Sequence, residues 1–250
     1  MDGTLYDGHH HIVPPLTAAA LPELQARGHK VFLCTSRCLQ ELSHLPASVR
    51  AFPFDARVTD GGTLITDPQG HILHETPVRP EIIEQLDAWC RENGVTWRYS
   101  TREGNYYGTP PRPWIENILF SLYLTGPVYR PWQGQTAYNL LVFVTTKEQE
   151  EAVRKIAQGM SVVAYTNCLE LHENGWTKAD AAAHLKEQYG LDPIVCFGDA
   201  DNDVEMLERA DLGVSLANAT PLCRAAADVV IEAVSEDGIG KWLKEKNYEV

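Results

Sequence analysis

The segment that decides the fold is Ile194-Val195-Cys196-Phe197-Gly198-Asp199-Ala200-Asp201-Asn202-Asp203. Its first four residues favour a buried strand, and the polar residues after Gly198 favour a loop that opens a helix near Asp203. Open α/β sheets bind ligands where their strands end in this way. We therefore expect Asp199 to offer a carboxylate to a Mg²⁺ ion, with Asn202 and Asp203 as further oxygen ligands. A polar loop with a helix cap at Asn202 is the alternative.

The segments on both sides of this strand alternate between helices and strands. After the middle of the chain, helices are expected at 178–189, 203–209, 221–226 and 239–245, and strands at 194–197, 212–215 and 229–231. Near the start, we expect a helix at 17–27, strands at 30–34 and 56–59, and a hairpin over 63–73. Such alternation predicts an α/β fold with a doubly wound parallel sheet.

The pattern between these two parts is different. Helices are expected at 81–91, 113–124 and 147–158, with strands at 95–100, 140–145, 162–165 and 169–172. A chain of 250 residues also exceeds the usual size of one compact core. We therefore expect a core made of 1–76 and 173–250, with an inserted α+β cap domain at 77–172.

The composition excludes several classes of partner. The net charge of −13 argues against nucleic acid and anionic membranes as partners. An anionic ligand would have to be held locally, by a metal ion, a few cations and helix N-termini. Six cysteines lie dispersed in the chain and are expected to be reduced, buried thiols of a cytoplasmic protein. The sequence does not indicate an oligomeric state.

Two further stretches carry candidate site residues. Thr35-Ser36-Arg37 follows the strand expected at 30–34, so a hydroxyl and backbone N–H groups could hold a phosphoryl oxygen. A simple helix N-cap is the alternative there. Lys178 lies in the first turn of an expected helix, where it could offset the charge of a metal-bound phosphate. A solvated surface lysine is the alternative.

The first residues connect these stretches to a known family. Asp2-Gly3-Thr4-Leu5 matches the second half of the phosphatase motif Asp-x-Asp-Gly-Thr-Leu. Together with Thr35, Lys178 and Gly198-Asp199-x-x-Asn202-Asp203, it resembles the four motifs of the haloacid dehalogenase (HAD) superfamily. Within it, the chain resembles the Cof-like phosphatases, whose type IIB cap lies between motifs two and three. It departs from them at Ser36, where they usually have Gly, and at Asp60-Gly61-Gly62, where they usually have Asn-Gly-Ala.

The resemblance implies a HAD-like Rossmannoid core and Mg²⁺-dependent hydrolysis of a small phosphomonoester through an aspartyl-phosphate intermediate. The substrate would be a phosphorylated metabolite such as a sugar phosphate, a nucleotide or a phosphorylated cofactor. Trp97, Arg98, Tyr99, Arg102, Tyr106 and Tyr107 are candidates for choosing it.

The resemblance also implies a role for each motif residue. Asp2 would protonate the leaving oxygen and then activate water. Thr35 would bind a phosphoryl oxygen and Lys178 would offset its charge. Ser36, Arg37 and Asn202 would contact the substrate. Mg²⁺ would be held by Asp199, by the backbone carbonyl of Asp2, and by Asn202 or Asp203.

The nucleophile implied by the resemblance is not among the 250 residues. It would stand two positions before Asp2, and Met1 occupies the x of Asp-x-Asp. The strand that carries it in the family lies in the middle of the core sheet and is missing as well, so we expect two neighbouring strands to have unpaired edges. Either the start is assigned at an internal methionine, which the three intact motifs favour, or a truncated protein has lost catalysis. We expect an apolar strand ending in Asp to be encoded upstream, and we expect the chain as given to be inactive.

Two other functions stay open. A phosphoryl transferase or mutase needs the same chemistry, and an inactive homologue would bind Mg²⁺ and a phosphorylated ligand without releasing phosphate. His9-His10-His11 suggests a metal site, but consecutive side chains point in different directions. We expect these histidines in a loop near the cap entrance.

Overall fold

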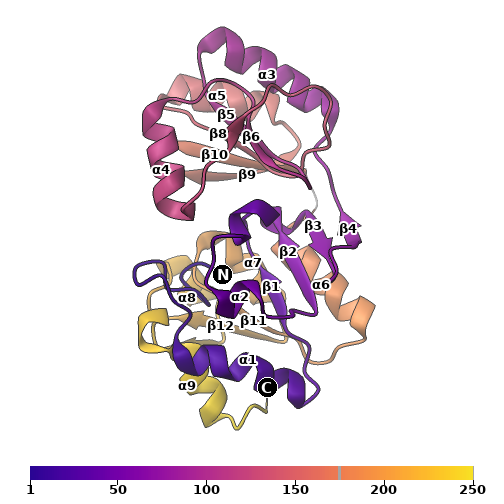
Figure 1. The fold of residues 1–250 in the computed structure, drawn as a ribbon, viewed down its shortest axis with the longest axis vertical. Helices are drawn as coiled ribbons and strands as arrows, with labels where there is room; N and C mark the ends of the chain where they lie inside the picture. The colour runs from indigo at the N-terminus through magenta and orange to yellow at the C-terminus, as the bar shows by residue number, and fades with distance from the viewer. Residues whose placement is uncertain (174–175, 250) are drawn as a thin grey trace.

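The computed structural model describes residues 1–173 and 176–249, and it contains two units, one above the other in Figure 1. Asn174, Gly175 and Val250 lie outside the described residues, so the boundary expected at 173 adjoins a stretch without description. Across the described part of the chain, no helix combines the length and the apolar character needed to cross a membrane.

The upper unit, residues 80–173, is built on one six-stranded sheet. The strands, in the order in which they pair, are β7 (Val128–Tyr129), β6 (Asn105–Tyr107), β5 (Trp97–Ser100), β8 (Leu140–Val142), β10 (Cys168–Glu173) and β9 (Met160–Tyr165). Only β6 and β7 pair in parallel. Three helices accompany this sheet: α3 (Pro80–Asn93), α4 (Pro113–Tyr123) and α5 (Lys147–Ile156).

Strand alternation gives the upper sheet two different faces. Trp97, Tyr99 and Leu140 pack in one cluster with residues of α3 and α5. Leu141, the neighbour of Leu140, instead packs with α4, which lies nearer the lower unit than α3 does (Figure 1). Because successive side chains of a strand point to opposite faces, one face is apolar under α3 and α5, and the other turns to the lower unit.

The lower unit contains two sheets. The first has the order β1 (Phe32–Cys34), β2 (Ala56–Thr59), β3 (Leu64–Thr66) and β4 (Ile72–Glu75). The second has the order β11 (Val195–Gly198), β12 (Leu212–Leu216) and β13 (Val229–Ile231). The pairs β1–β2, β11–β12 and β12–β13 are parallel, whereas β3 pairs antiparallel with both of its neighbours.

Helices cover both faces of these sheets. They are α1 (Pro15–Ala26), α2 (Ala47–Arg50), α6 (Lys178–Tyr189), α7 (Val204–Arg209), α8 (Pro221–Ala226) and α9 (Gly238–Glu245). Short 3-10 turns are η1 (Leu39–Leu42), η2 (Asp60–Gly62), η3 (Asp201–Asp203) and η4 (Val234–Glu236). α1 and α9 pack against β12 and β13, while α6, α7 and α8 pack against β11 from the other face. The expected α/β class with parallel strands is therefore present.

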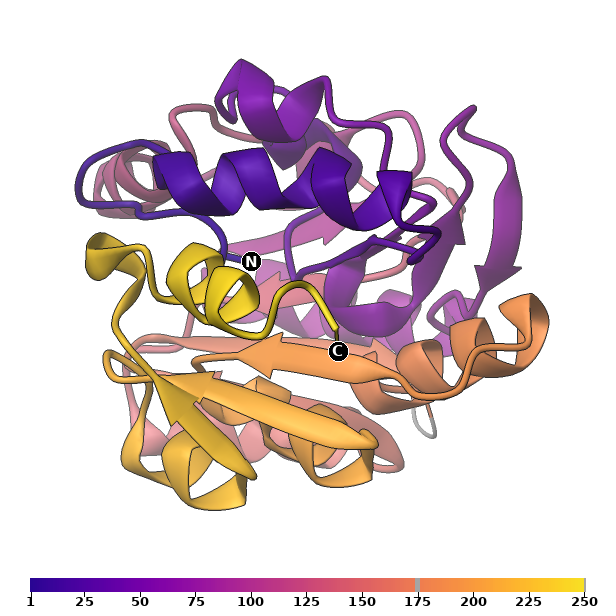
Figure 2. The ribbon, with the colours of Figure 1, turned by 90° about the horizontal axis from the view of Figure 1, so that it is seen from below.

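In the described part of the chain, the lower unit has two neighbouring strands with unpaired edges, as expected when the family's central strand is missing. Among the described strands, β1 pairs only with β2, and β11 pairs only with β12. Figure 2 shows the purple strands and the orange to yellow strands as two groups, with the N-terminus beside the space between them. The core sheet is thus divided into two half sheets, each with an edge strand in the interior of the unit.

Candidate active site

All eight predicted site residues line one pocket of about 630 Å³ between the two units. They are Asp2, Thr35, Ser36, Arg37, Lys178, Asp199, Asn202 and Asp203. Thr35 follows β1, Lys178 begins α6, and Asp199 follows β11, so the pocket lies at the carboxyl ends of the parallel strands. Residues far apart in the sequence therefore meet at one rim, as the strand endings predicted.

The first loop of the chain is fitted against Asp199. Gly3 has a φ of +72°, and a Cβ atom there would lie 2.1 Å from Oδ2 of Asp199. The hydroxyl of Thr4 donates a hydrogen bond of 2.5 Å to Oδ1 of the same carboxylate. Only glycine meets both demands at position 3, because it tolerates the left-handed backbone and leaves room for the carboxylate.

Asp2 is held by Arg37. The guanidinium donates from Nε to Oδ2 at 3.0 Å and from Nη2 to Oδ1 at 2.5 Å, which is the two-point geometry of the stronger ion pairs. The Arg37 side chain is 5% exposed and lies 4.8 Å from the ring of Tyr123 in α4. The Asp2 side chain is 45% exposed, so its carboxylate stays open to the pocket.

Lys178 and Asp203 form a buried ion pair. Thr177 precedes α6, and its N–H donates to Asp180, which fixes the first turn that carries Lys178. Nζ of Lys178 donates to Oδ1 of Asp203 at 2.7 Å and to Oδ1 of Asn202 at 3.2 Å. Burial alone would raise the pKa of Asp203, but the ammonium of Lys178 outweighs it and lowers that pKa to about 2. The pair is therefore charged at neutral pH.

Hydroxyl and amide groups complete the lower wall. The N–H of Thr35 donates to the carbonyl of Val58 and so extends the pairing of β1 with β2 by one residue. Oγ1 of Thr35 accepts a hydrogen bond from the Arg37 N–H at 3.1 Å. Nδ2 of Asn202 donates to Oγ of Ser36 at 3.0 Å. The two strand ends are thus joined directly across the pocket floor.

The expected metal ligands do not form a ready set of carboxylates. Among the described residues, no three His, Cys, Asp or Glu side chains are grouped as a metal site. Asp2 faces Arg37, and Asp203 accepts from Lys178 with Oδ1 and from the N–H groups of Asp199 and Ala200 with Oδ2. A metal ion bound directly by Asp203, as expected from the sequence, would therefore compete with these three hydrogen bonds.

Asp199 fits a cation better. Its half-buried carboxylate makes no salt bridge within residues 1–173 and 176–249, and its side-chain partner is the neutral Thr4 hydroxyl. Burial raises the pKa of Asp199 above its ordinary value. A half-buried carboxylate without an ion-pair partner is the kind of oxygen donor that Mg²⁺ takes.

The wall opposite the motif residues contains Arg98, which was a candidate, and acidic residues that were not anticipated. Arg98 of β5 donates to Glu41 of η1 at 2.7 Å, and each side chain is 2% exposed. Glu170 of β10 accepts from Asn139 and from Tyr165. Burial would raise the pKa of Glu170, but His172 and these donors lower it to about 2. The polar residues at alternate positions of 168–172 were the available sequence signal for this face.

The structure places some of the candidates from the upper sheet and the histidine run at the pocket and others away from it. Trp97 and Tyr99 are fully buried under α3 and α5, away from the pocket, whereas Arg98 between them lines it. His10 pairs with Asp7, and His11 lies 3.0 Å from the hydroxyl of Tyr6 and lines the pocket. The histidines have different partners, as expected of neighbours in a loop.

Comparison with known proteins gives the same picture. The model of the haloacid dehalogenase-like hydrolases matches residues 1–243. The HMP-PP phosphatase of Citrobacter koseri is 27% identical over 88% of this chain and 83% of its own. The 5-amino-6-(5-phospho-D-ribitylamino)uracil phosphatase YcsE of Bacillus subtilis is 23% identical over 98% of this chain and 92% of its own.

Among solved structures, the HAD subclass IIB sugar phosphatase BT4131 has the same fold. Its TM-score is 0.85 at 23% identity, with 99% of this chain and 96% of that one covered. At this identity the match speaks for the fold alone. With a family model that spans nearly the whole chain, we conclude that this protein belongs to the haloacid dehalogenase-like hydrolases.

Proposed function

We propose that this chain is a Mg²⁺-dependent phosphatase for small phosphomonoesters, working through an aspartyl-phosphate intermediate. Its nucleophile would stand two positions before Asp2, outside the 250 residues. The observation that carries the proposal is the convergence of Asp2, Thr35, Lys178 and Asp199 on one pocket. These are the groups that phosphoryl transfer requires: an acid and base, a hydroxyl donor, a cation and a metal-binding carboxylate.

The residues of this chain would divide the work as follows. The Thr35 hydroxyl and the N–H groups after it would donate to phosphoryl oxygens. The ammonium of Lys178 would offset the negative charge of the phosphate. Asp203 and Asn202 hold this ammonium in position. Asp2 would give its proton to the leaving oxygen and then take one from water. Ser36 and Asn202 would line the substrate side of the site.

The metal would be held by Asp199, by the backbone carbonyl of Asp2 and by Asn202, with Asp203 positioned behind them. When bound, Mg²⁺ supplies positive charge to the phosphoryl oxygens and orients them.

Arg37 has two possible partners during the reaction. In the structure its guanidinium is paired with the Asp2 carboxylate. We propose that a bound phosphomonoester draws Arg37 away from Asp2 and toward its own negative charge. The upper unit would close over the substrate as a cap, since its polar face lines the same pocket.

The 250 residues by themselves would lack turnover, because the implied nucleophile is not among them. They would still bind a phosphorylated small molecule. We also propose a reducing, cytoplasmic setting, in which the six free cysteines stay as thiols.

The test is phosphate release by a chain extended before Met1 with an apolar segment that ends in Asp. Turnover of an aryl phosphate and a panel of sugar phosphates should require Mg²⁺, and it should vanish when the added Asp is replaced by Asn. No turnover in a folded, Asp-extended chain would refute the phosphatase proposal. Turnover by the unextended chain would show that another group acts as the nucleophile.

A further inference from the structure

Helix α4 turns an apolar stripe toward the pocket between the two units. Trp114, Ile118 and Leu122 follow one another at intervals of four residues, and all three line the pocket. Ile118 is 41% exposed and Leu122 is 57% exposed. Ile115 and Leu119, one position further round the helix, instead pack with residues of the upper sheet. Apolar side chains left exposed in a concave pocket are typical of a ligand-binding surface.

The polar side chains that the upper sheet brings to the same pocket are engaged with one another. Arg98, Asn139 and Glu170 are each at most 2% exposed. Asn139 accepts a hydrogen bond from Arg98 and donates one to Glu170, and Glu170 also accepts from the hydroxyl of Tyr165. A ligand in the pocket would therefore contact the exposed side chains of α4 before it reached this buried network.

The stripe ends beside the proposed acid. Nη2 of Arg37, which donates to Oδ1 of Asp2, lies 3.4 Å from the carbonyl oxygen of Leu122. The ring of Tyr123 lies 4.8 Å from the same guanidinium. The leaving oxygen has to lie at Asp2 to receive its proton. The group attached to that oxygen therefore begins within reach of Leu122.

We propose that this stripe is a subsite for an aromatic ring, and that the preferred substrates carry their phosphate on such a ring or on a carbon attached to it. Trp114, Tyr123 and Tyr165 all line the pocket, and aromatic rings pack favourably against one another. A sugar phosphate would instead place hydroxyl groups against Ile118 and Leu122, which offer them no hydrogen bond. The inference rests on the proposed function for the position of the phosphate.

The turn that joins β9 and β10 has exposed polar side chains. Thr166 and Asn167 line the pocket there. They can bond a hydroxyl group or a nitrogen of a ring, whereas Ser121 of α4 donates to the carbonyl of Ile118. The subsite therefore also admits rings with a polar substituent.

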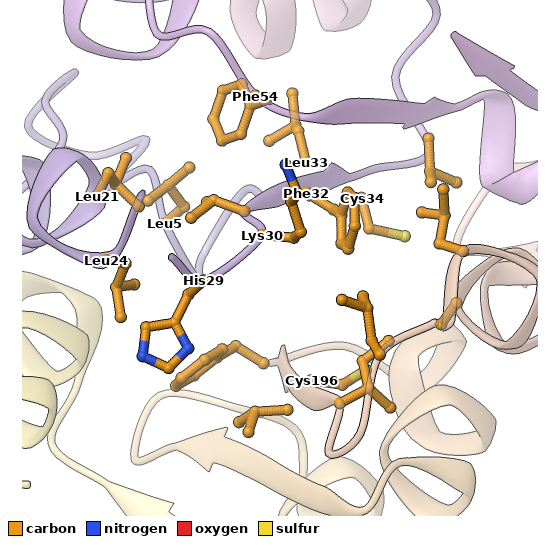
Figure 3. A pocket seen from close by; sticks show the side chains of 18 of the residues that line it. Leu5, Leu21, Leu24, His29, Lys30, Phe32, Leu33, Cys34, Phe54 and Cys196 are labelled. Carbon is orange, nitrogen blue, oxygen red and sulfur yellow. The ribbon is translucent and has the colours of Figure 1, made fainter. Parts of the chain in front are cut away.

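A cavity of about 390 Å³ inside the lower unit is apolar as well, but it lacks the phosphate end. Figure 3 shows its labelled side chains, among them Leu21, Phe32 and Leu33, around an open space. Within the described residues, neither Arg37 nor Lys178 lines it. An aromatic compound bound there would need no phosphate and would not contact α4.

The test measures binding by the 250-residue chain in the presence of Mg²⁺, so it does not depend on turnover. Calorimetry should find benzyl phosphate bound at least about tenfold more tightly than glucose-6-phosphate. Benzyl alcohol has the ring without the phosphate and should bind much more weakly than benzyl phosphate. It reports how well an aromatic ring binds in the lower cavity.

Two exposed positions of α4 supply matched variants. Leu122→Ser removes an apolar side chain from the pocket, whereas Phe120, which is 59% exposed, lies on the same helix outside the pocket lining. Leu122→Ser should weaken benzyl phosphate binding about tenfold and leave glucose-6-phosphate binding unchanged. Phe120→Ser should change neither. Leu122→Met keeps an apolar side chain and should retain most of the affinity for benzyl phosphate.

The outcomes separate the subsite from the proposed function. The expected effects on benzyl phosphate, without phosphate release by the Asp-extended chain, would support the subsite and refute the phosphatase proposal. Phosphate release with equal kcat/KM for benzyl phosphate and glucose-6-phosphate, and equal affinities in Leu122→Ser and Phe120→Ser, would overturn the subsite alone. Benzyl alcohol bound as tightly as benzyl phosphate, with no effect of Leu122→Ser, would also overturn it, since the ring would then bind away from α4.

Discussion

The two units of this protein differ in how completely their strands are paired. The upper unit joins its six described strands in one hydrogen-bonded sheet and buries an apolar cluster under α3 and α5. The lower unit has similar strands and more helices, yet its sheet is divided and leaves a cavity of about 390 Å³. The difference teaches that the unit with most of the candidate site residues is the unit whose parallel strands leave unpaired edges.

The comparison also concerns charge. The upper unit contributes Arg98 to a buried ion pair with Glu41, whereas the lower unit keeps Lys178 and Asp203 as a buried pair at the pocket floor. The first pair joins the two units, and the second belongs to the proposed chemistry. Substitutions should therefore separate a stability effect from a catalytic one.

The largest effect is expected from Arg98→Met. Removing one partner of a buried ion pair leaves Glu41 uncompensated and should cost about 3–5 kcal/mol of unfolding free energy. Urea titration measures it. The exposed pair of Arg154 with Glu150 is the control, since Arg154→Met should cost about 0.5 kcal/mol or less. The double variant with Glu41→Gln should recover part of the loss, and a loss as small as that of Arg154→Met would contradict the role of this pair.

Lys178→Met should act on catalysis. In the Asp-extended chain, loss of the cation beside the phosphate should lower kcat by roughly 10²–10³, or about 3–4 kcal/mol. Lys186→Met, at an exposed ion pair in the same helix, should leave kcat unchanged. Steady-state kinetics with an aryl phosphate decides between them, and equal rates for the two variants would exclude Lys178 from the chemistry.

Asp60→Asn should stabilise the protein at high pH. Burial raises the pKa of Asp60 to about 6, although Ser100 and Arg98 oppose the shift. The folded state therefore binds a proton more tightly than the unfolded chain, and stability falls as pH rises from about 4 through 6. The Asn variant should gain about 3 kcal/mol at pH 8 relative to pH 3, where Asp60 is protonated in both states. Thermal melts over this range measure it, and a pH-independent difference would contradict the shift.

Gly3→Ala should have a small effect on folding and a specific effect on the site. The left-handed backbone should cost about 1 kcal/mol, as it should in Gly28→Ala, where φ is +93° and no atom lies within 4 Å of an added Cβ. Only at position 3 would the methyl displace the Asp199 carboxylate. Calorimetry should find weaker Mg²⁺ binding by the extended Gly3→Ala chain alone, and equal Mg²⁺ affinity in both variants would speak against Asp199 as a ligand.

Much of the fold was predictable from the sequence because its elements are short and sharply bounded. The helices expected at 178–189 and 221–226 and the strand expected at 56–59 have the same bounds in the structure. β6, β7, η1 and α2 were not predicted, because two to four residues without apolar periodicity carry little signal. Pro22 does not end α1, which runs on to Ala26.

Site residues that directly follow strands were predictable from their motifs. Residues on the opposite wall of the pocket were less predictable. Asp2, Thr35, Lys178 and Asp199 were expected at one rim and line one pocket. Glu41 and Tyr123 were missed, because their places depend on how the upper unit sits on the lower one. Trp97 and Tyr99 were offered as substrate contacts, but strand alternation puts them in the core and Arg98 at the pocket.

Amide hydrogen exchange tests the divided sheet most directly. The amides of β1 and β11 should exchange much faster than those of β8 and β10, the inner strands of the upper sheet. The apolar, Asn-ended extension should slow exchange in β1 and β11 by at least about tenfold and leave β8 and β10 unchanged. Equal protection of all four strands in the unextended chain, or no change on extension, would contradict the account.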